Sequence, residues 1–154
     1  ELPITRPLPL GVAEVTPLDM ASAYASLGNG GYRASGYSIL EMRNLDGEVV
    51  YDRAIDGPSA PRILSAEAVA GMNQMLHQVI EAGTARRAQL PGIAAAGKTG
   101  TTQAYRDAWF IGYTGRYTAS VWYGNDDFPS ANNLTGGQQV RSHNHPRAAI
   151  ILRH

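Results

Sequence analysis

Hydrophobic and polar positions recur with helical spacing in two parts of the chain, and both parts carry helix boundary signals. The first predicted helix has Thr16 as its N-cap, Pro17 at its first position and Asp19 three residues after the cap. This is the capping-box spacing, with an acid one carbon shorter than glutamate. We expect the helix to run to Leu27, where the glycine- and asparagine-rich stretch 28–31 ends it.

The second predicted helix is longer, beginning after Ser65 and ending before Gly83. Its apolar side chains recur every three or four residues and form the expected packing face: Val69, Met72, Leu76 and Val79. His77 lies beside this stripe, where a single histidine is typical of a surface residue or a hydrogen-bonded core residue. We assign His77 no functional role.

Two hairpins are predicted from β-prone runs that flank turn residues. Residues 37–42 and 48–51 flank the turn sequence 44–47, Asn-Leu-Asp-Gly. Further along, the aromatic and β-branched runs 108–114 and 117–124 flank a Gly-Arg turn. Each pair of runs therefore predicts two antiparallel strands.

A preceding strand at about 94–102 would turn the second hairpin into a three-stranded antiparallel meander. Helices and strands in this order predict an α+β fold in which an antiparallel sheet is flanked by helices. Residues 1–9 contain three prolines and are expected to be an extended lead-in.

The predicted first strand of the meander carries the only lysine among the 13 basic residues of the chain. Lysine is a compact point charge whose proton affinity responds to burial and neighbours, whereas arginine stays charged. Lys98 stands between Gly97 and Thr99, with Gly100 following. This setting indicates a functional site.

One alternative for this stretch is nucleotide binding, because residues 92–99 fit the phosphate-loop pattern G-x-x-x-x-G-K-[ST]. That loop needs an apolar strand before it and a helix after it. The preceding residues 84–91 are too polar for a buried strand, and Gly100 interrupts the helix that should begin at Thr99. The pattern therefore favours a strand, and the phosphate loop is kept as a remote alternative.

Two separate blocks of this sequence resemble the transpeptidase domain of class A penicillin-binding proteins, the bifunctional enzymes of peptidoglycan synthesis. The resemblance extends over about residues 8–137, and its two blocks occur in the family's order. The first contains 10–20, 23–25 and 29–32, and the second contains 97–102, 107–110 and 112–114. It implies a fragment of the penicillin-binding and β-lactamase-like fold.

The resemblance also implies roles for five residues in acyl transfer through a serine ester. Lys98 would supply positive charge beside the substrate carboxylate and take part in the proton relay, and the Thr99 hydroxyl would bind that carboxylate. Gly100 would let the substrate backbone lie against the strand edge. Thr101 would give its backbone N–H to the oxyanion, and Thr102 would support the strand beside the substrate.

The nucleophile that the family uses is not in this sequence. A Ser-x-x-Lys motif needs serine three residues before lysine, and Ala95 stands three before Lys98. The family's Ser-x-Asn motif should precede the lysine strand, but the triplets at 130–132 and 142–144 follow it, as coincidences of composition. We expect the C-terminal part of a transpeptidase domain, inactive alone. The alternative is a non-catalytic remnant or binding module of the same fold.

The other end of the chain departs from the family. We expect residues 1–137 to form the transpeptidase part and 138–154 to be a divergent, disordered tail, as a frameshift or truncated reading frame would produce. His143, His145 and His154 lack a further ligand at a defined spacing, so no metal site is predicted. The resemblance implies no cofactor.

The composition narrows the possible partners. The 154 residues are 44% hydrophobic, carry a formal net charge of zero and include no cysteine, which fits one globular domain without an electrostatic basis for nucleic-acid binding. The resemblance implies peptidoglycan stem peptides ending in D-alanyl-D-alanine and β-lactams as ligands. It also implies contact with the N-terminal part of the same domain. The expected location is the periplasmic face of the bacterial inner membrane, through an anchor outside this sequence.

Overall fold

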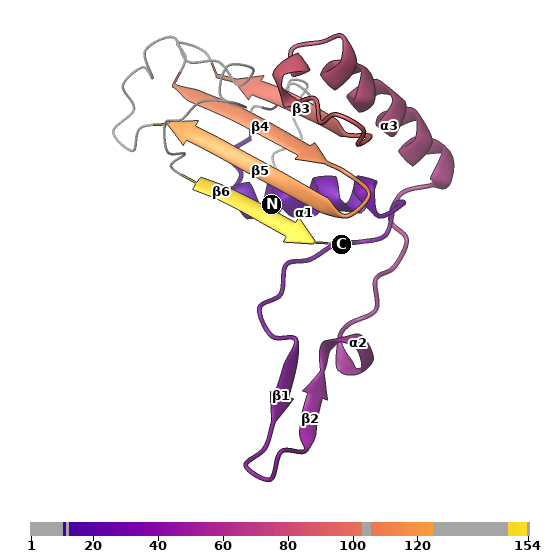
Figure 1. The fold of residues 1–154 in the computed structure, drawn as a ribbon, viewed down its shortest axis with the longest axis vertical. Helices are drawn as coiled ribbons and strands as arrows, with labels where there is room; N and C mark the ends of the chain where they lie inside the picture. Colours follow the sequence, from indigo (N-terminus) through magenta and orange to yellow (C-terminus); the bar gives the residue numbers. More distant parts are fainter. Residues whose placement is uncertain (1–10, 12, 103–105, 125–147, 154) are drawn as a thin grey trace.

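The computed structural model describes residue 11 and residues 13–102, 106–124 and 148–153. These residues form a four-stranded antiparallel sheet with helices packed against it, and a small separate hairpin that projects away from the sheet (Figure 1). The arrangement is the predicted α+β class.

The main sheet has its strands in sequence order, β3-β4-β5-β6. The strands are β3 (Ala96–Thr101), β4 (Asp107–Tyr113), β5 (Tyr117–Gly124) and β6 (Ala148–Arg153). Thr99 pairs with Phe110, which in turn pairs with Val121. The predicted meander is confirmed, and it leaves β3 at one edge of the described sheet.

β6 corrects the expectation of a disordered tail for residues 148–153. This segment pairs antiparallel with β5, from Trp122 opposite Ala148 to Tyr117 opposite Arg153. The run Ile150-Ile151-Leu152 is apolar and β-prone, and pairing with β5 satisfies the backbone groups of both strands. Residues 138–147, with His143 and His145, lie outside the described residues, as does His154.

The first helix, α1 (Pro17–Gly28), begins with the predicted capping box. The Thr16 hydroxyl accepts a hydrogen bond from the Asp19 backbone N–H at 3.1 Å, and the Asp19 carboxylate accepts one from the Thr16 N–H at 3.3 Å. Gly30 and Gly31 follow the helix with φ of 84° and 96°, which glycine adopts without strain. α1 packs across β4, β5 and β6 and covers one face of the sheet (Figure 1).

The long helix, α3 (Ala66–Glu81), has Ser65 as its N-cap and packs along β3. Its buried side chains are Val69, Leu76 and Ile80, whereas Met72 is 38% exposed. The predicted stripe was therefore wrong at Met72. The buried face is rotated because α3 lies beside the edge of the sheet.

Helices and sheet meet in one small core. Its buried members are Leu27, Leu76, Ala96 and Tyr113, with Tyr24 and Leu64 packed against them. The cluster therefore joins α1, α3 and the first two strands of the meander. β3, which carries Lys98, is fixed at its N-terminal end by this core.

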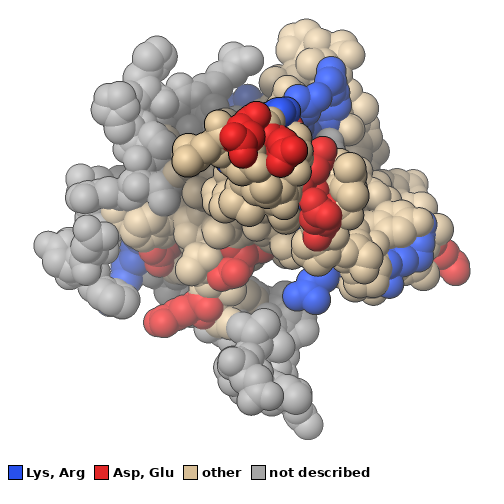
Figure 2. Space-filling model, turned by 90° about the horizontal axis from the view of Figure 1, so that it is seen from below, with Lys and Arg blue, Asp and Glu red and all other residues tan. Residues whose placement is uncertain are grey.

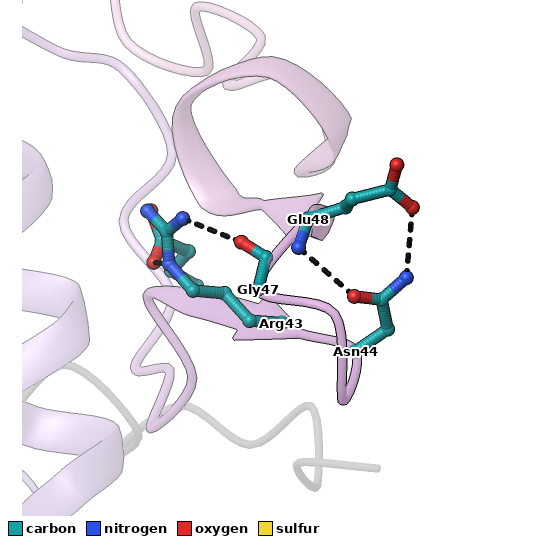
Figure 3. Close-up of polar contacts among 5 residues, drawn as sticks. Arg43, Asn44, Gly47 and Glu48 are labelled. Carbon is teal, nitrogen blue, oxygen red and sulfur yellow. Dashed lines mark hydrogen bonds and ion pairs between the residues drawn. The ribbon is translucent and has the colours of Figure 1, made fainter.

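The separate hairpin consists of β1 (Glu41–Arg43) and β2 (Val49–Asp52), followed by the short helix α2 (Arg53–Asp56). The Asn44 side chain closes its turn by accepting from the backbone N–H of Asp46 at 3.0 Å and of Glu48 at 2.9 Å. Arg43 donates to the Gly47 carbonyl at 2.9 Å (Figure 3). The predicted hairpin is confirmed, with a shorter first strand than expected and a second strand shifted by one residue.

Acidic and basic side chains occur side by side on the face of the molecule seen in Figure 2. This distribution agrees with the zero net charge of the chain. No helix in the described parts of the chain has both the length and the apolar character needed to cross a membrane.

Candidate active site

The sequence-predicted site lies on the outer strand of the sheet. Residues 98–101 belong to β3, and Thr102 follows its last residue. β3 pairs with β4 on one side only, so its other edge has no strand partner in the described structure. Lys98 is exposed on this strand, and no carboxylate in the described residues forms an ion pair with its ammonium group.

Strand geometry distributes the site residues over both faces of the sheet. Side chains alternate along a strand, so Lys98 and Gly100 lie on one face, and Thr99 and Thr101 lie on the other. The Lys98 side chain bends back along the strand, and its Nζ donates to the Thr99 carbonyl oxygen at 2.5 Å. The strand edge is the one place where groups from both faces can meet a single ligand.

Thr99 is held from the side of α3. Its side chain is only 9% exposed, and its Oγ1 lies 2.7 Å from Oγ1 of Thr84, in the turn after α3. Just before β3, His77 Nδ1 lies 2.8 Å from the Ala95 carbonyl oxygen. His77 is therefore a hydrogen-bonded, partly buried residue, as expected, and it ties α3 to the start of the strand.

Asp107 forms hydrogen bonds with Thr102 at the C-terminal end of β3. The Thr102 hydroxyl donates to Asp107 Oδ2 at 3.0 Å and accepts from the Asp107 N–H at 2.8 Å. The other carboxylate oxygen of Asp107 accepts from Trp122 Nε1 at 2.9 Å. Because its hydroxyl is engaged in these contacts, Thr102 stabilises the end of the strand.

Two glycines make the strand narrow at the site. A Cβ added to Gly97 would lie 2.7 Å from the Ile111 carbonyl oxygen and 3.0 Å from the Gly112 Cα, so only glycine fits without movement of the backbone. A Cβ added to Gly100 would lie 3.2 Å from the Trp109 Cβ. The absence of these side chains lets the neighbouring strand β4 come close.

Opposite Ala96, at the N-terminal end of β3, the phenol of Tyr113 links the sheet to α3. Its hydroxyl donates to Asn73 Oδ1 at 2.5 Å, and its ring lies edge-on to Tyr24 at 6.2 Å. Burial, with a smaller contribution from Tyr24, raises the pKa of Tyr113 from 10.0 to about 12. Tyr113 therefore stays protonated at neutral pH and acts as a hydrogen-bond donor.

The phosphate-loop alternative is wrong for this chain. Thr99 lies in the middle of β3, where the loop requires the first turn of a helix. Lys98 pairs with Ile111 across the sheet, so its backbone is extended and part of a ladder. Backbone N–H groups in that conformation do not converge on a phosphate.

The sequence as a whole identifies the family. Residues 6–143 match the family model described as the penicillin binding protein transpeptidase domain. The chain belongs to this family. Penicillin-binding protein 1A of Neisseria meningitidis is 36% identical over 143 residues, covering 91% of this chain and 18% of that protein. Its counterpart in Pseudomonas aeruginosa is 32% identical and covers 82% of this chain and 21% of that protein.

Solved structures give the same assignment. The penicillin-binding protein PonA1 from Mycobacterium tuberculosis matches with a TM-score of 0.78 and 26% identity, covering 88% of this chain and 38% of that chain. Penicillin-binding protein 1A from Haemophilus influenzae, at 24% identity and a TM-score of 0.71, shows the shared fold, over 87% of this chain and 26% of that chain. The resemblance to class A penicillin-binding proteins and the expected fold are confirmed.

The family match extends beyond residue 137, where the resemblance was expected to end. This chain spans about a fifth of the length of the curated relatives that it matches. The two Ser-x-Asn triplets, at 130–132 and 142–144, lie outside the described residues.

No sequence pattern indicates that Thr84 and Asp107 are neighbours of the site. Thr84 follows a helix in a polar connector, and its contact with Thr99 crosses 15 residues of chain. Asp107 belongs to a block that resembles the family, and this alone does not place it beside Thr102. Paired hydroxyl and carboxylate contacts of this kind become visible only when the strands are assembled.

Proposed function

We propose that this chain supplies one wall of the active site of a serine-type D,D-transpeptidase that cross-links peptidoglycan. The observation that carries the proposal is the placement of Lys98, Thr99 and Gly100 on the open edge of β3. The site would act together with a nucleophilic serine from the N-terminal part of the same domain. The ligands would be D-alanyl-D-alanine stem peptides and the β-lactams that mimic them.

Each residue of the strand has a chemical task in this proposal. A stem peptide would lie along the open edge of β3, paired as an added strand, with Gly100 allowing the close approach. Lys98, which has no carboxylate partner in the described structure, would place its charge beside the substrate carboxylate and the proton relay. The Thr99 hydroxyl would hydrogen-bond that carboxylate.

The chemistry is acyl transfer in two steps. The serine oxygen attacks the carbonyl carbon between the two D-alanines, and the developing oxyanion is stabilised by the Thr101 N–H and the N–H of the serine. The terminal D-alanine leaves, taking a proton, and an amine of a neighbouring stem peptide then displaces the serine. One bound structure among the relatives, PonA1 from Mycobacterium tuberculosis, was obtained in complex with penicillin V.

The location follows from the same proposal. Peptidoglycan cross-linking takes place outside the cytoplasmic membrane, so the protein would act at the periplasmic face of the inner membrane. The domain division is part of the proposal as well: residues 1–137 belong to the transpeptidase, and β6, which pairs with β5, belongs to the same sheet.

A labelling experiment tests the proposal. The adjoining upstream DNA is searched for Ser-x-x-Lys and Ser-x-Asn, and the protein including that region is exposed to a fluorescent penicillin. We expect covalent labelling of the longer protein and none of the 154-residue chain alone. Labelling of a serine within residues 1–154 would overturn the assignment of the nucleophile to the N-terminal part.

Substitution of Lys98 gives the sharper measurement. In the longer protein, Lys98→Ala removes the charge at the reacting centre and should slow acylation about 100-fold, the usual effect of removing one electrostatic contact to a transition state. Lys98→Arg serves as the control because it keeps the charge. A longer protein that takes no label at all would favour the non-catalytic binding module.

A further inference from the structure

The turn that follows α3 presents a hydroxyl group to the substrate-binding strand from a fixed position. Gly83 packs so closely on α3 that an added Cβ would lie 2.8 Å from the Val79 Cα and carbonyl oxygen. The Ala85 N–H donates to the Val79 carbonyl at 3.1 Å, and Ala85 is completely buried. Thr84, between these two anchored residues, has little freedom to move.

The hydroxyl of Thr84 meets the hydroxyl of Thr99 at 2.7 Å. Either oxygen can donate in this pair, so two hydrogen-bond directions are available in the free protein. Each hydroxyl has one hydrogen to donate and two lone pairs to accept with. If Thr99 donates to Thr84, it can offer an incoming carboxylate only lone pairs, which repel it.

We propose that Thr84 is a positioning residue that accepts no hydrogen from Thr99 during catalysis and instead donates to it, directing the Thr99 hydrogen toward the ligand carboxylate. This inference rests on the proposed function, in which Thr99 binds that carboxylate. The resulting chain runs from the Thr84 hydroxyl to the Thr99 hydroxyl to the carboxylate. Hydrogen bonds in such a chain polarise and strengthen one another.

Burial strengthens the dependence of Thr99 on this partner. The Thr99 side chain is only 9% exposed, so few water molecules can replace a lost donor. Thr84 itself is exposed, so a conservative substitution there leaves the core intact. Loss of the Thr84 hydroxyl should therefore affect binding of the carboxylate more than folding.

The experiment uses the longer protein, which includes the upstream region, and two acylating probes, benzylpenicillin and its methyl ester. The ester lacks the carboxylate charge. Thr84→Val removes the hydroxyl and keeps the branched shape, whereas Thr84→Ser keeps the hydroxyl. We expect Thr84→Val to slow acylation by benzylpenicillin about tenfold, to leave acylation by the ester within about twofold, and to be rescued by Thr84→Ser.

Two results with Thr84→Val would overturn the inference. Equal slowing with both probes would indicate a structural role for Thr84, and no slowing with either would remove the role altogether. Thr99→Val distinguishes failure of the inference from failure of the proposed function. If Thr99→Val lowers the preference for the free acid and Thr84→Val does not, only the inference fails; if neither variant changes that preference, the proposed role of Thr99 fails too.

Discussion

Substitution of Tyr113 by phenylalanine tests how the sheet beneath the site is joined to α3. The phenylalanine keeps the ring in the core cluster with Leu27 and Leu76, and it removes the hydroxyl that donates to Asn73 Oδ1 at 2.5 Å. Asn73 is then left with a partly buried acceptor that has lost its donor. At about pH 8 we expect the substitution to lower the free energy of unfolding by about 1 kcal/mol.

At high pH the effect of the same substitution on the free energy of unfolding should have the opposite sign. The folded protein holds the pKa of Tyr113 at about 12, compared with 10.0 for a free tyrosine. This difference corresponds to at most about 2.7 kcal/mol of stability, fully present below about pH 10 and lost as the pH rises through about 12. Tyr113 is only 5% exposed, so solvent screens little of this contribution. The phenylalanine variant has no proton to lose there and should become the more stable protein above about pH 11.

Urea denaturation at about pH 8 and at several values between 10 and 12, followed by circular dichroism, measures the crossing. Subtracting the two proteins removes the titration of the other tyrosines, apart from the coupling between Tyr24 and Tyr113. Tyr117→Phe is the control, because Tyr117 lies on the same sheet and is 48% exposed. A stability difference that stays constant from pH 8 to 12 would refute the role assigned to the Tyr113 hydroxyl.

Two further substitutions test the strand and the first helix. Gly97→Ala should destabilise the protein by about 2 kcal/mol, because the new Cβ would lie 2.7 Å from a backbone oxygen, whereas Gly115→Ala, with nothing within 4 Å, should change stability by less than about 0.5 kcal/mol. Equal melting temperatures for the two variants would contradict this account. Thr16→Ala removes the capping box and should cost about 1 kcal/mol, with Thr16→Ser close to the wild type; an unchanged melting temperature for Thr16→Ala would show that the cap contributes nothing.

The sequence predicted those elements whose boundaries depend on local chemistry. The capping box at Thr16, the cap at Ser65 and the Asn-Leu-Asp-Gly turn each act within a few residues, and all three are present in the structure. The strand at 148–153 was missed because its short apolar run follows a polar, proline-bearing stretch. Its partner, β5, ends at Gly124 and is distant in sequence, so no local pattern announces the pairing.

For the candidate site, the sequence predicted the position of the strand but not the side-chain contacts around it. A solitary lysine beside glycine and threonine located β3, and the flanking aromatic runs indicated the sheet around it. The burial of Thr99 and its contact with Thr84 depend on how α3 packs along β3, which periodicity alone does not determine. The same packing turned Met72 outward.

The position of β3 at the sheet edge creates a structural problem that the contacts around it solve. An edge strand is paired on one side only, so it is freer to move than β4 or β5, yet the proposed chemistry requires fixed distances along it. In place of a second paired strand, α3 and the turn after it make two side-chain contacts. His77 contacts the Ala95 carbonyl, and Thr84 contacts Thr99. The first contact is made to Ala95, just before β3, and the second is made to the Thr99 side chain. Neither uses a backbone group of β3, so the outer edge of the strand stays available for a ligand. The precision of the site should therefore depend on α3, although α3 contributes no residue proposed to touch the substrate.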